Sequence, residues 1–332
     1  MVSGEKKRKY LRCAAIVFLC VFVLSAGFFV LELWESKQGL FADSGAHTDG
    51  EESVFLDGKE YVAKDNIETV LVMGLDKFEG VSTGDSYNND RQADFLMLFV
   101  FDNKENVCTA LHINRDTMAE MNVLGVAGNK VGTITQQLAL AHTYGNGKEV
   151  SCRNAANAVS KLLLGAPIDH YLSVTMDAVP VFTDLVGGVE VEVLDDFAGI
   201  DDTLVKGERV TLTGEHALHY VRTRYGLEDS TNESRMARQR QFLKALYEKT
   251  DVCIENDDAF VADAVVKMSE YIVSDCSGNH LQTLFEKITT YQLDTIRSLE
   301  GKTVLGEEHM EFYPEAGSIT AVVADLFYTA VE

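Results

Sequence analysis

Proline and basic residues are both scarce in this sequence, and each shortage excludes something. Only three prolines occur among 332 residues, which argues against a proline-rich linker. Lys and Arg number 29 against 52 Asp and Glu, so the formal net charge is -23 at pH 7. Nucleic acid binding at ordinary salt needs a basic face that neutralises several phosphates. The composition therefore argues against a DNA- or RNA-binding protein, and no internal repeat or low-complexity segment stands out.

Recognisable cysteine and histidine motifs are also lacking. Outside the N-terminal apolar run the chain has Cys108, Cys152, Cys253 and Cys276. Their spacing matches no zinc signature, and four cysteines leave three disulfide pairings open. No Ser or Cys nucleophile motif accompanies the histidines, which disfavours a hydrolase triad. The histidines considered are His112, His142, His216 and His219.

The N-terminus carries an uncharged apolar run, Cys13–Leu31. At 1.5 Å per residue, about 19 residues are long enough to cross a hydrocarbon core of about 30 Å. Basic residues precede the run and Glu32 and Glu35 follow it, so the positive-inside rule places the N-terminus in the cytoplasm. A cleavable signal peptide is the alternative, but the run exceeds the usual length and Ser25-Ala26-Gly27 is a poor cleavage motif.

Four regions follow from this reading. We predict a cytoplasmic basic segment at 1–12, a transmembrane helix at 13–33, a polar extracytoplasmic stalk at 34–65 and one large domain at 66–332. A hydrophobic content of 46% is enough for a sizeable core in that domain. The protein would then be a single-pass membrane protein with its domain outside the cell.

Within the domain, apolar runs alternate with helical patterns. Such alternation predicts an α/β domain. The predicted strands are 70–76, 95–101, 107–113, 170–176 and 189–194. The predicted helices are 133–144, 152–164, 178–186, 214–224, 235–249, 258–272 and 281–293.

The first three predicted strands have Asp or Arg at one end. Asp76 ends the first strand, Arg91 and Asp94 precede the second, and Arg115 and Asp116 follow the third. Such ends commonly meet at the edge of an open α/β sheet, where ligands bind. Each Asp has an alternative interpretation as a turn or cap residue. Carboxylates beside a phosphate site would need a hard cation such as Mg2+ between them and the ligand.

Five arginines gather between Tyr220 and Gln241 in YVRTRYGLEDSTNESRMARQRQ. Guanidinium groups bind phosphate oxygens in a bidentate manner and keep their charge on burial. Against so acidic a background, the cluster indicates a phosphate or pyrophosphate site. The alternative is a solvated helix face that pairs with nearby acids. The arginines are Arg222, Arg224, Arg235, Arg238 and Arg240.

These segments, taken in order, resemble the LytR-CpsA-Psr family of envelope phosphotransferases, which attach glycopolymers to peptidoglycan. The resemblance is dense over 66–250, and the ending EFYPEAGSITAVVADLFY also resembles the family's terminal strand and helix. Matching segments are VLVMGLD at 70–76, RQAD at 91–94, INRDTM at 113–118, the stretch at 163–193, LTGEHALHYVRTR at 212–224 and RMARQRQFLKAL at 235–246.

The resemblance implies a fold and a reaction. The expected fold is a mixed central β-sheet sandwiched by helices. The expected reaction transfers a glycopolymer, such as teichoic acid or capsule, from a polyprenyl (undecaprenyl) pyrophosphate carrier to a MurNAc hydroxyl of peptidoglycan. A phosphodiester forms and polyprenyl phosphate is released. The implied setting is the membrane of a Gram-positive-type envelope, with membrane lipid and peptidoglycan as partners and no nucleic acid.

The resemblance also implies residue roles. Asp76 and Asp94 would bind Mg2+ or Mn2+. Asp116 would orient Arg115 or act as general base, and together with Arg115, Arg222 and Arg224 it forms the predicted catalytic set. The pyrophosphate would contact Arg91, Arg115, Arg222, Arg224, Arg238, Gln239 and Gln241.

The chain departs from the family pattern at several places. Asn232 stands where an aspartate is common before the later arginines, Asn114 stands where a proline is common, and QLALAHTYG replaces a Lys-Ile-Asn segment. Two other functions stay open: a polyprenyl-pyrophosphate hydrolase, and a noncatalytic envelope binding or regulatory protein.

Overall fold

The computed structural model describes residues 53–331, apart from 57, 77–90, 126, 225, 230, 258, 278–279, 281–282, 285–286, 288–290 and 308. The predicted segments at 1–12 and 13–33 lie outside the described residues, as does most of the predicted stalk. Within the described ranges, none of the helices has the length and apolar character needed to cross a bilayer.

A six-stranded mixed sheet forms the centre of the domain, in the order β11-β8-β3-β4-β5-β12. β3 is parallel to β8 and antiparallel to β4, and β5 is antiparallel to β4 and parallel to β12. The strands are β3 (Ile67–Leu75), β4 (Ala93–Asp102), β5 (Val107–His112), β8 (His170–Thr175), β11 (Ile272–Ser274) and β12 (Gln292–Ser298).

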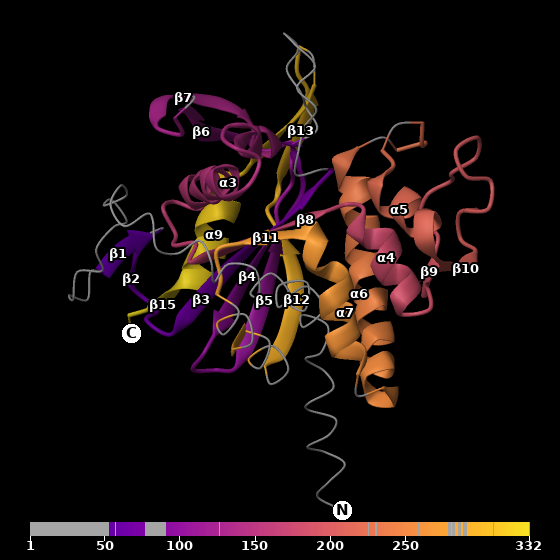
Figure 1. Ribbon diagram of the computed structural model, residues 1–332. Coiled ribbons are helices and arrows are strands. Elements are labelled where there is room, and N and C mark those ends of the chain that lie inside the picture. The colour runs from indigo at the N-terminus through magenta and orange to yellow at the C-terminus, as the bar shows by residue number, and fades with distance from the viewer. Residues whose placement is uncertain are drawn as a thin grey trace, which may run out of the picture.

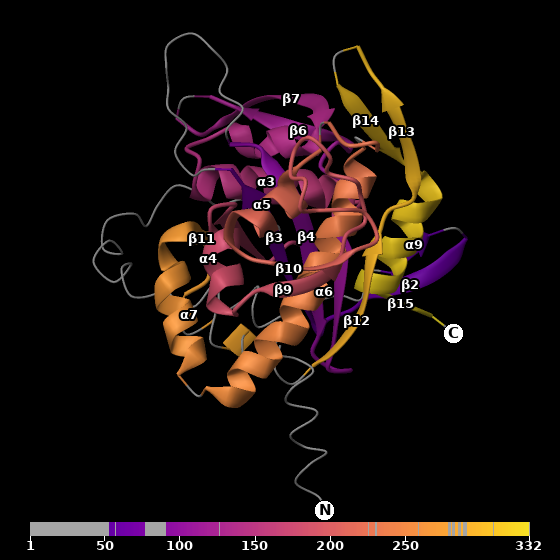
Figure 2. The same ribbon diagram turned by 90° about the vertical axis from the view of Figure 1, so that its right-hand side faces the viewer.

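Helices cover both faces of this sheet, as Figures 1 and 2 show. β3 and β4 read as nearly continuous apolar runs, IETVLVMGL and ADFLMLFVFD, as expected for strands buried on both faces. One face carries α3 (Glu149–Leu162), α9 (Ala316–Phe327) and the 3-10 helix η4 (Leu138–Thr143). The other carries α4 (Ala178–Leu185), α5 (Gly214–Arg222), α6 (Asn232–Asn256) and α7 (Phe260–Met268), which the 3-10 helix η5 (Ser269–Tyr271) follows. The predicted α-β-α arrangement is confirmed.

Smaller sheets surround this body. β1 (Ser53–Leu56), β2 (Lys59–Ala63) and β15 (Tyr328–Ala330) form one sheet. Three antiparallel pairs join β6 (Met118–Leu124) to β7 (Lys130–Gln137), β9 (Val189–Glu192) to β10 (Arg209–Leu212), and β13 (Gly301–Leu305) to β14 (Met310–Pro314). The expected terminal strand and helix correspond to β14 and α9.

Three predictions about elements need correction or qualification. The helix predicted at 133–144 was wrong, because β-branched residues around Thr133 and Ile134 pair as β7 with β6 and only η4 is helical. The stalk boundary at 65 is too late, since β1 and β2 already belong to the folded body. The predicted helix at 281–293 falls mostly outside the described residues, and Gln292 begins β12.

Candidate active site

The strand ends bring the predicted aspartates and arginines to one end of the central sheet. Asp76 directly follows β3, Asp94 is the second residue of β4, and Arg115 and Asp116 lie just after β5. Leu75 of β3 is paired with Ala93 of β4, so the two carboxylate-bearing ends are neighbours. The ends of these strands and the turns beside them thus position the side chains.

Ion pairs connect these residues into an Asp–Arg network. Arg115 pairs with Asp94, and its Nε lies 3.5 Å from Asp116 Oδ1. Arg224 Nη1 lies 3.2 Å from Asp116 Oδ2. Arg235 Nη1 lies 3.6 Å from Asp94 Oδ1. Beside the network, the exposed Arg222 places Nη2 3.0 Å from Asp76 Oδ2.

Asp116 is the buried hub of the network, with a side chain only 1% exposed. Besides its two arginine neighbours, it accepts a hydrogen bond of 3.1 Å from Gln137 Nε2. Gln137 itself is fixed by donating to the Met310 carbonyl at 2.7 Å. A carboxylate held this way is well placed to orient the guanidinium groups of Arg115 and Arg224.

Arg235 of the network and the buried His112 have shifted pKa values. Burial lowers the pKa of Arg235 to about 10, which still leaves it charged at neutral pH. Burial, together with the positive charges of Arg240 and Arg235, lowers the pKa of His112 to about 3. His112 is therefore neutral at ordinary pH, and its ring packs 4.9 Å from that of Phe95.

The two departures from the family pattern contact each other. Asn232 Nδ2 donates to Asn114 Oδ1 at 2.6 Å, and both side chains are buried. Asn114 Oδ1 also accepts from the backbone N–H of Asp116 at 2.9 Å, while Asn232 Oδ1 accepts from Arg235 at 2.5 Å. This Asn pair ties the start of α6 to the turn that carries Arg115. Sequence reasoning treated the two positions separately and missed the link.

Arg238 and Gln241 lie on a different side of α6. Arg238, 1% exposed, pairs with Asp195 at 2.5 Å and lies 5.3 Å over the ring of Phe197. Gln241 donates to the Glu192 carbonyl at 2.8 Å and accepts from the Tyr220 hydroxyl at 2.5 Å. These contacts hold α6 against β9 and α5, and the predicted contact of both residues with pyrophosphate stays a prediction.

The remaining predicted residues border the network. The Arg91 carbonyl accepts a hydrogen bond of 2.9 Å from His142 Nδ1. Burial lowers the pKa of His142 to about 4, so its ring is neutral at ordinary pH. Gln239 Nε2 donates to the Val221 carbonyl at 3.1 Å. Gln239 also lines an adjoining cavity.

This cavity of about 120 Å³ lies between β3, β4, β8, α4 and α6 and is almost wholly apolar. Gly74, Phe95 and Val221 line it. In sequence, these three lie within two residues of Asp76, Asp94 and Arg222 respectively. Its other walls include Val174, Met176, Val179, Phe182, Phe242, Leu243, Leu246 and Tyr247. An apolar cavity therefore ends beside a cluster of charged groups.

Known proteins with similar sequences are named as teichoic acid transferases. The chain is 28% identical over 209 residues to the polyisoprenyl-teichoic acid–peptidoglycan teichoic acid transferase TagV of Bacillus subtilis (strain 168), covering 59% of this chain and 50% of TagV. It is 26% identical over 246 residues to TagU of Bacillus licheniformis, covering 74% of this chain and 72% of that protein. The match thus spans half the length of TagV.

Solved structures share the fold. The crystal structure of B. subtilis TagV superposes with a TM-score of 0.58 at 24% identity, covering 79% of this chain and 96% of the chain in that crystal structure. The structure of TagT bound to LIIa-WTA gives a TM-score of 0.57 at 22% identity, covering 79% of this chain and 90% of the TagT chain. The family model described as the LytR_cpsA_psr family matches residues 35–316. Because that match includes the central sheet, the Asp–Arg network and α6, the chain belongs to the LytR_cpsA_psr family.

Proposed function

We propose that this protein transfers a glycopolymer from a polyprenyl pyrophosphate carrier to a MurNAc hydroxyl of peptidoglycan. The observation that carries the proposal is the juxtaposition of the Asp–Arg network with an apolar cavity. A polyprenyl pyrophosphate has the same division, a charged head and a long apolar tail. The names of TagV and TagU, polyisoprenyl-teichoic acid–peptidoglycan teichoic acid transferases, support the same class of reaction.

Arg115 and Arg224 of the network, together with Arg222 beside it, would bind the pyrophosphate. Arg222 and Arg224 follow each other at the end of α5, and Arg115 approaches from the turn after β5. Each is paired with a carboxylate here, so its guanidinium is already oriented. Phosphate oxygens would replace the carboxylates as acceptors and receive bidentate, charge-assisted hydrogen bonds from these guanidinium groups. Phosphoryl transfer depends mainly on such positioning and charge neutralisation.

Asp76 and Asp94 would hold a divalent cation when substrate is bound. Both offer hard carboxylate oxygens from neighbouring strand ends, a donor set that fits Mg2+ or Mn2+. Two carboxylates leave coordination positions for substrate phosphates, as is usual for Mg2+. The cation would offset the negative charge that gathers on the phosphates during transfer.

Asp116 takes the orienting role in this proposal. Its oxygens receive Arg224 and Gln137, and Arg115 lies beside them. The oxygen of the MurNAc hydroxyl would bond to the phosphorus next to the glycan, and its proton would pass to the departing polyprenyl phosphate. The bond from that phosphorus to the bridging oxygen would break, releasing polyprenyl phosphate. The polyprenyl tail would extend out of the cavity between α4 and α6.

Product analysis tests this proposal. Full-length protein in detergent would be incubated with a lipid-linked glycan and peptidoglycan, with Mg2+ or with EDTA. We expect a glycan-murein phosphodiester that forms with Mg2+, is suppressed by EDTA and returns when Mg2+ or Mn2+ is added back. Release of free glycan phosphate would instead indicate a hydrolase. Lipid binding with no product in any condition would favour a noncatalytic binding protein.

A further inference from the structure

A second cluster of chemically active side chains lies at the opposite end of the central sheet. Glu68 is the second residue of β3 and His170 is the first of the parallel β8, so both sit where these strands begin. Asp76 follows the other end of β3, eight residues after Glu68 and therefore about 26 Å away at 3.3 Å per residue. The cluster is therefore separate from the Asp–Arg network.

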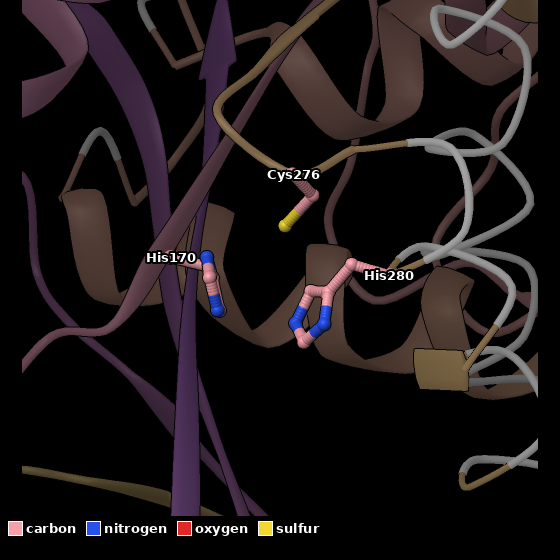
Figure 3. A group of neighbouring side chains, drawn as sticks. All are labelled: His170, Cys276 and His280. Atoms are coloured by element: carbon pink, nitrogen blue, oxygen red, sulfur yellow. The ribbon is translucent and has the colours of Figure 1, made fainter.

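The chain after β11 brings two more side chains to this place. β11 runs antiparallel to β8, so the residues that follow Ser274 arrive beside His170. Asp275 anchors this return by accepting from the Tyr171 N–H at 3.1 Å. Cys276 and His280 come next and turn toward His170, as Figure 3 shows.

The three side chains are close enough to share one ion. One ligand atom from each of His170, Cys276 and His280 lies within 4.8 Å of the other two. Around a tetrahedral zinc with bonds of 2.0 to 2.3 Å, ligand atoms are roughly 3.3 to 3.7 Å apart. Small side-chain rotations would close the remaining gap.

Glu68 adds a fourth donor atom. Its Oε1 lies 2.7 Å from His280 Nε2 and 3.8 Å from His170 Nε2. Glu68 Oε1, His280 Nε2 and, on the other side of its ring, His170 Nδ1 are buried atoms without a hydrogen-bond partner. Buried polar atoms rarely stay unsatisfied, and a bound ion would satisfy these three once Glu68 Oε1 moves from 2.7 Å to the spacing of about 3.3 Å from His280 Nε2 that zinc ligands have.

We propose that His170, Cys276, His280 and Glu68 form a binding site for Zn2+ or a similar transition-metal ion. A thiolate with two imidazoles selects zinc over Mg2+ or Ca2+, which prefer oxygen ligands alone. Four protein ligands make a closed site, which is the structural kind. The ion would fasten the segment after β11 to the starting ends of β3 and β8. Sequence spacing concealed the site because only Cys276 and His280 are close in the chain.

Nearby groups complete the outer surroundings of this site. Lys287 Nζ lies 2.7 Å from Glu68 Oε2, the oxygen that would not bind the ion. Asp275 Oδ1 lies 3.6 Å from His170 Nδ1 and would help to orient that ring. Such outer partners fix the orientation of the ligands and typically change metal affinity by about 10- to 100-fold.

Cobalt substitution provides the test. Full-length protein, reduced and stripped with a chelator, would be titrated with Co2+ in detergent. We expect one equivalent to give a thiolate-to-metal absorption band that added Zn2+ abolishes. Cys276→Ser should lose the band, while Cys253→Ser, whose cysteine lies on α6, should retain it. Lys287→Met should weaken binding by about 10- to 100-fold.

Stability measurements provide a second readout. Zn2+ should raise the Tm of the parent and of Cys253→Ser but leave Cys276→Ser and His280→Asn unchanged, with far-UV circular dichroism confirming that the variants fold. Absence of the thiolate band in the parent, or its persistence in Cys276→Ser, would overturn the proposal. This outcome is independent of transfer activity, because the Asp–Arg network contains no cysteine.

Discussion

Arg222 and Arg224 leave the end of α5 two residues apart, with side chains 53% and 12% exposed. Each donates to a carboxylate that substrate phosphate would replace. Replacing either with Ala removes a charge-assisted contact of about 1.5–3 kcal/mol, so transfer should fall about 10- to 150-fold. The measurement is kcat/KM for lipid-linked glycan.

Arg209→Ala is the matched control, because Arg209 lies on β10 with a side chain 75% exposed. That variant should keep parental kcat/KM, and all three proteins should have the same circular dichroism spectrum. Full activity in both Arg222→Ala and Arg224→Ala would remove these two arginines from the mechanism.

Arg238 should behave differently from those two arginines. Arg238→Ala breaks a buried ion pair, so the carboxylate of Asp195 loses its cationic partner, and it also removes the contact with Phe197. We expect the free energy of unfolding to fall by about 3–5 kcal/mol. Urea unfolding measures this loss. An unchanged stability with lost transfer would instead return Arg238 to the pyrophosphate site, as the sequence first suggested.

The sequence predicts which residue types form the site better than it predicts where each side chain points. Asp76, Asp94 and Asp116 follow from strand ends, and their meeting needs only the sheet order. Arg235 and Arg238 are one helical turn apart, yet one contacts Asp94 and the other Asp195. That difference depends on how α6 packs against β9, which local sequence does not specify.

The junction between α6 and the turn after β5 rests on the Asn pair. Asn114 and Asn232 should therefore be energetically coupled. In a double-mutant cycle of Asn114→Ala and Asn232→Ala, we expect a coupling of roughly 0.5–3 kcal/mol in unfolding free energy, because either single change leaves a buried amide unsatisfied. Strictly additive losses would show that the hydrogen bond contributes no stability.

The cavity face of α6 offers another test at the level of elements. Leu243→Asp places an unpaired carboxylate in the apolar cavity, and such burial costs several kcal/mol. Binding of polyprenyl phosphate should weaken by more than about tenfold, as measured by fluorescence titration. The control is Val266→Asp on α7, where the side chain is 73% exposed. Equal affinity in both variants would place the lipid elsewhere.

Strands buried on both faces were the easiest elements to predict, because β3 and β4 are long apolar runs. The stretch at 133–144 was harder. Its apolar residues are too few to show whether their spacing follows a helical period. It forms a strand because it pairs with β6, and that pairing is known only from the fold. β2 was missed as well; it pairs with the adjacent β1 and with β15, which lies at the far end of the chain.

For the whole molecule, the predicted topology remains to be tested. With the N-terminus inside and 13–33 spanning the membrane, protease added to intact protoplasts should digest the α/β domain. Immunoblotting against the domain measures the loss. A cytoplasmic marker protein should survive the same treatment. Survival of the domain as well would place it inside the cell and argue against a role in peptidoglycan modification.

The pairing of β15 with β2 has a consequence for biosynthesis. Lys64 Nζ donates to the Asp325 carbonyl across 261 positions of sequence. At 5–20 residues per second, the ribosome needs roughly 13 to 52 seconds to supply that partner after β2 has been made. During this interval β2 presents an open hydrogen-bonding edge. The nascent chain therefore passes through a stage in which other chains, or chaperones, compete for the place that β15 finally takes.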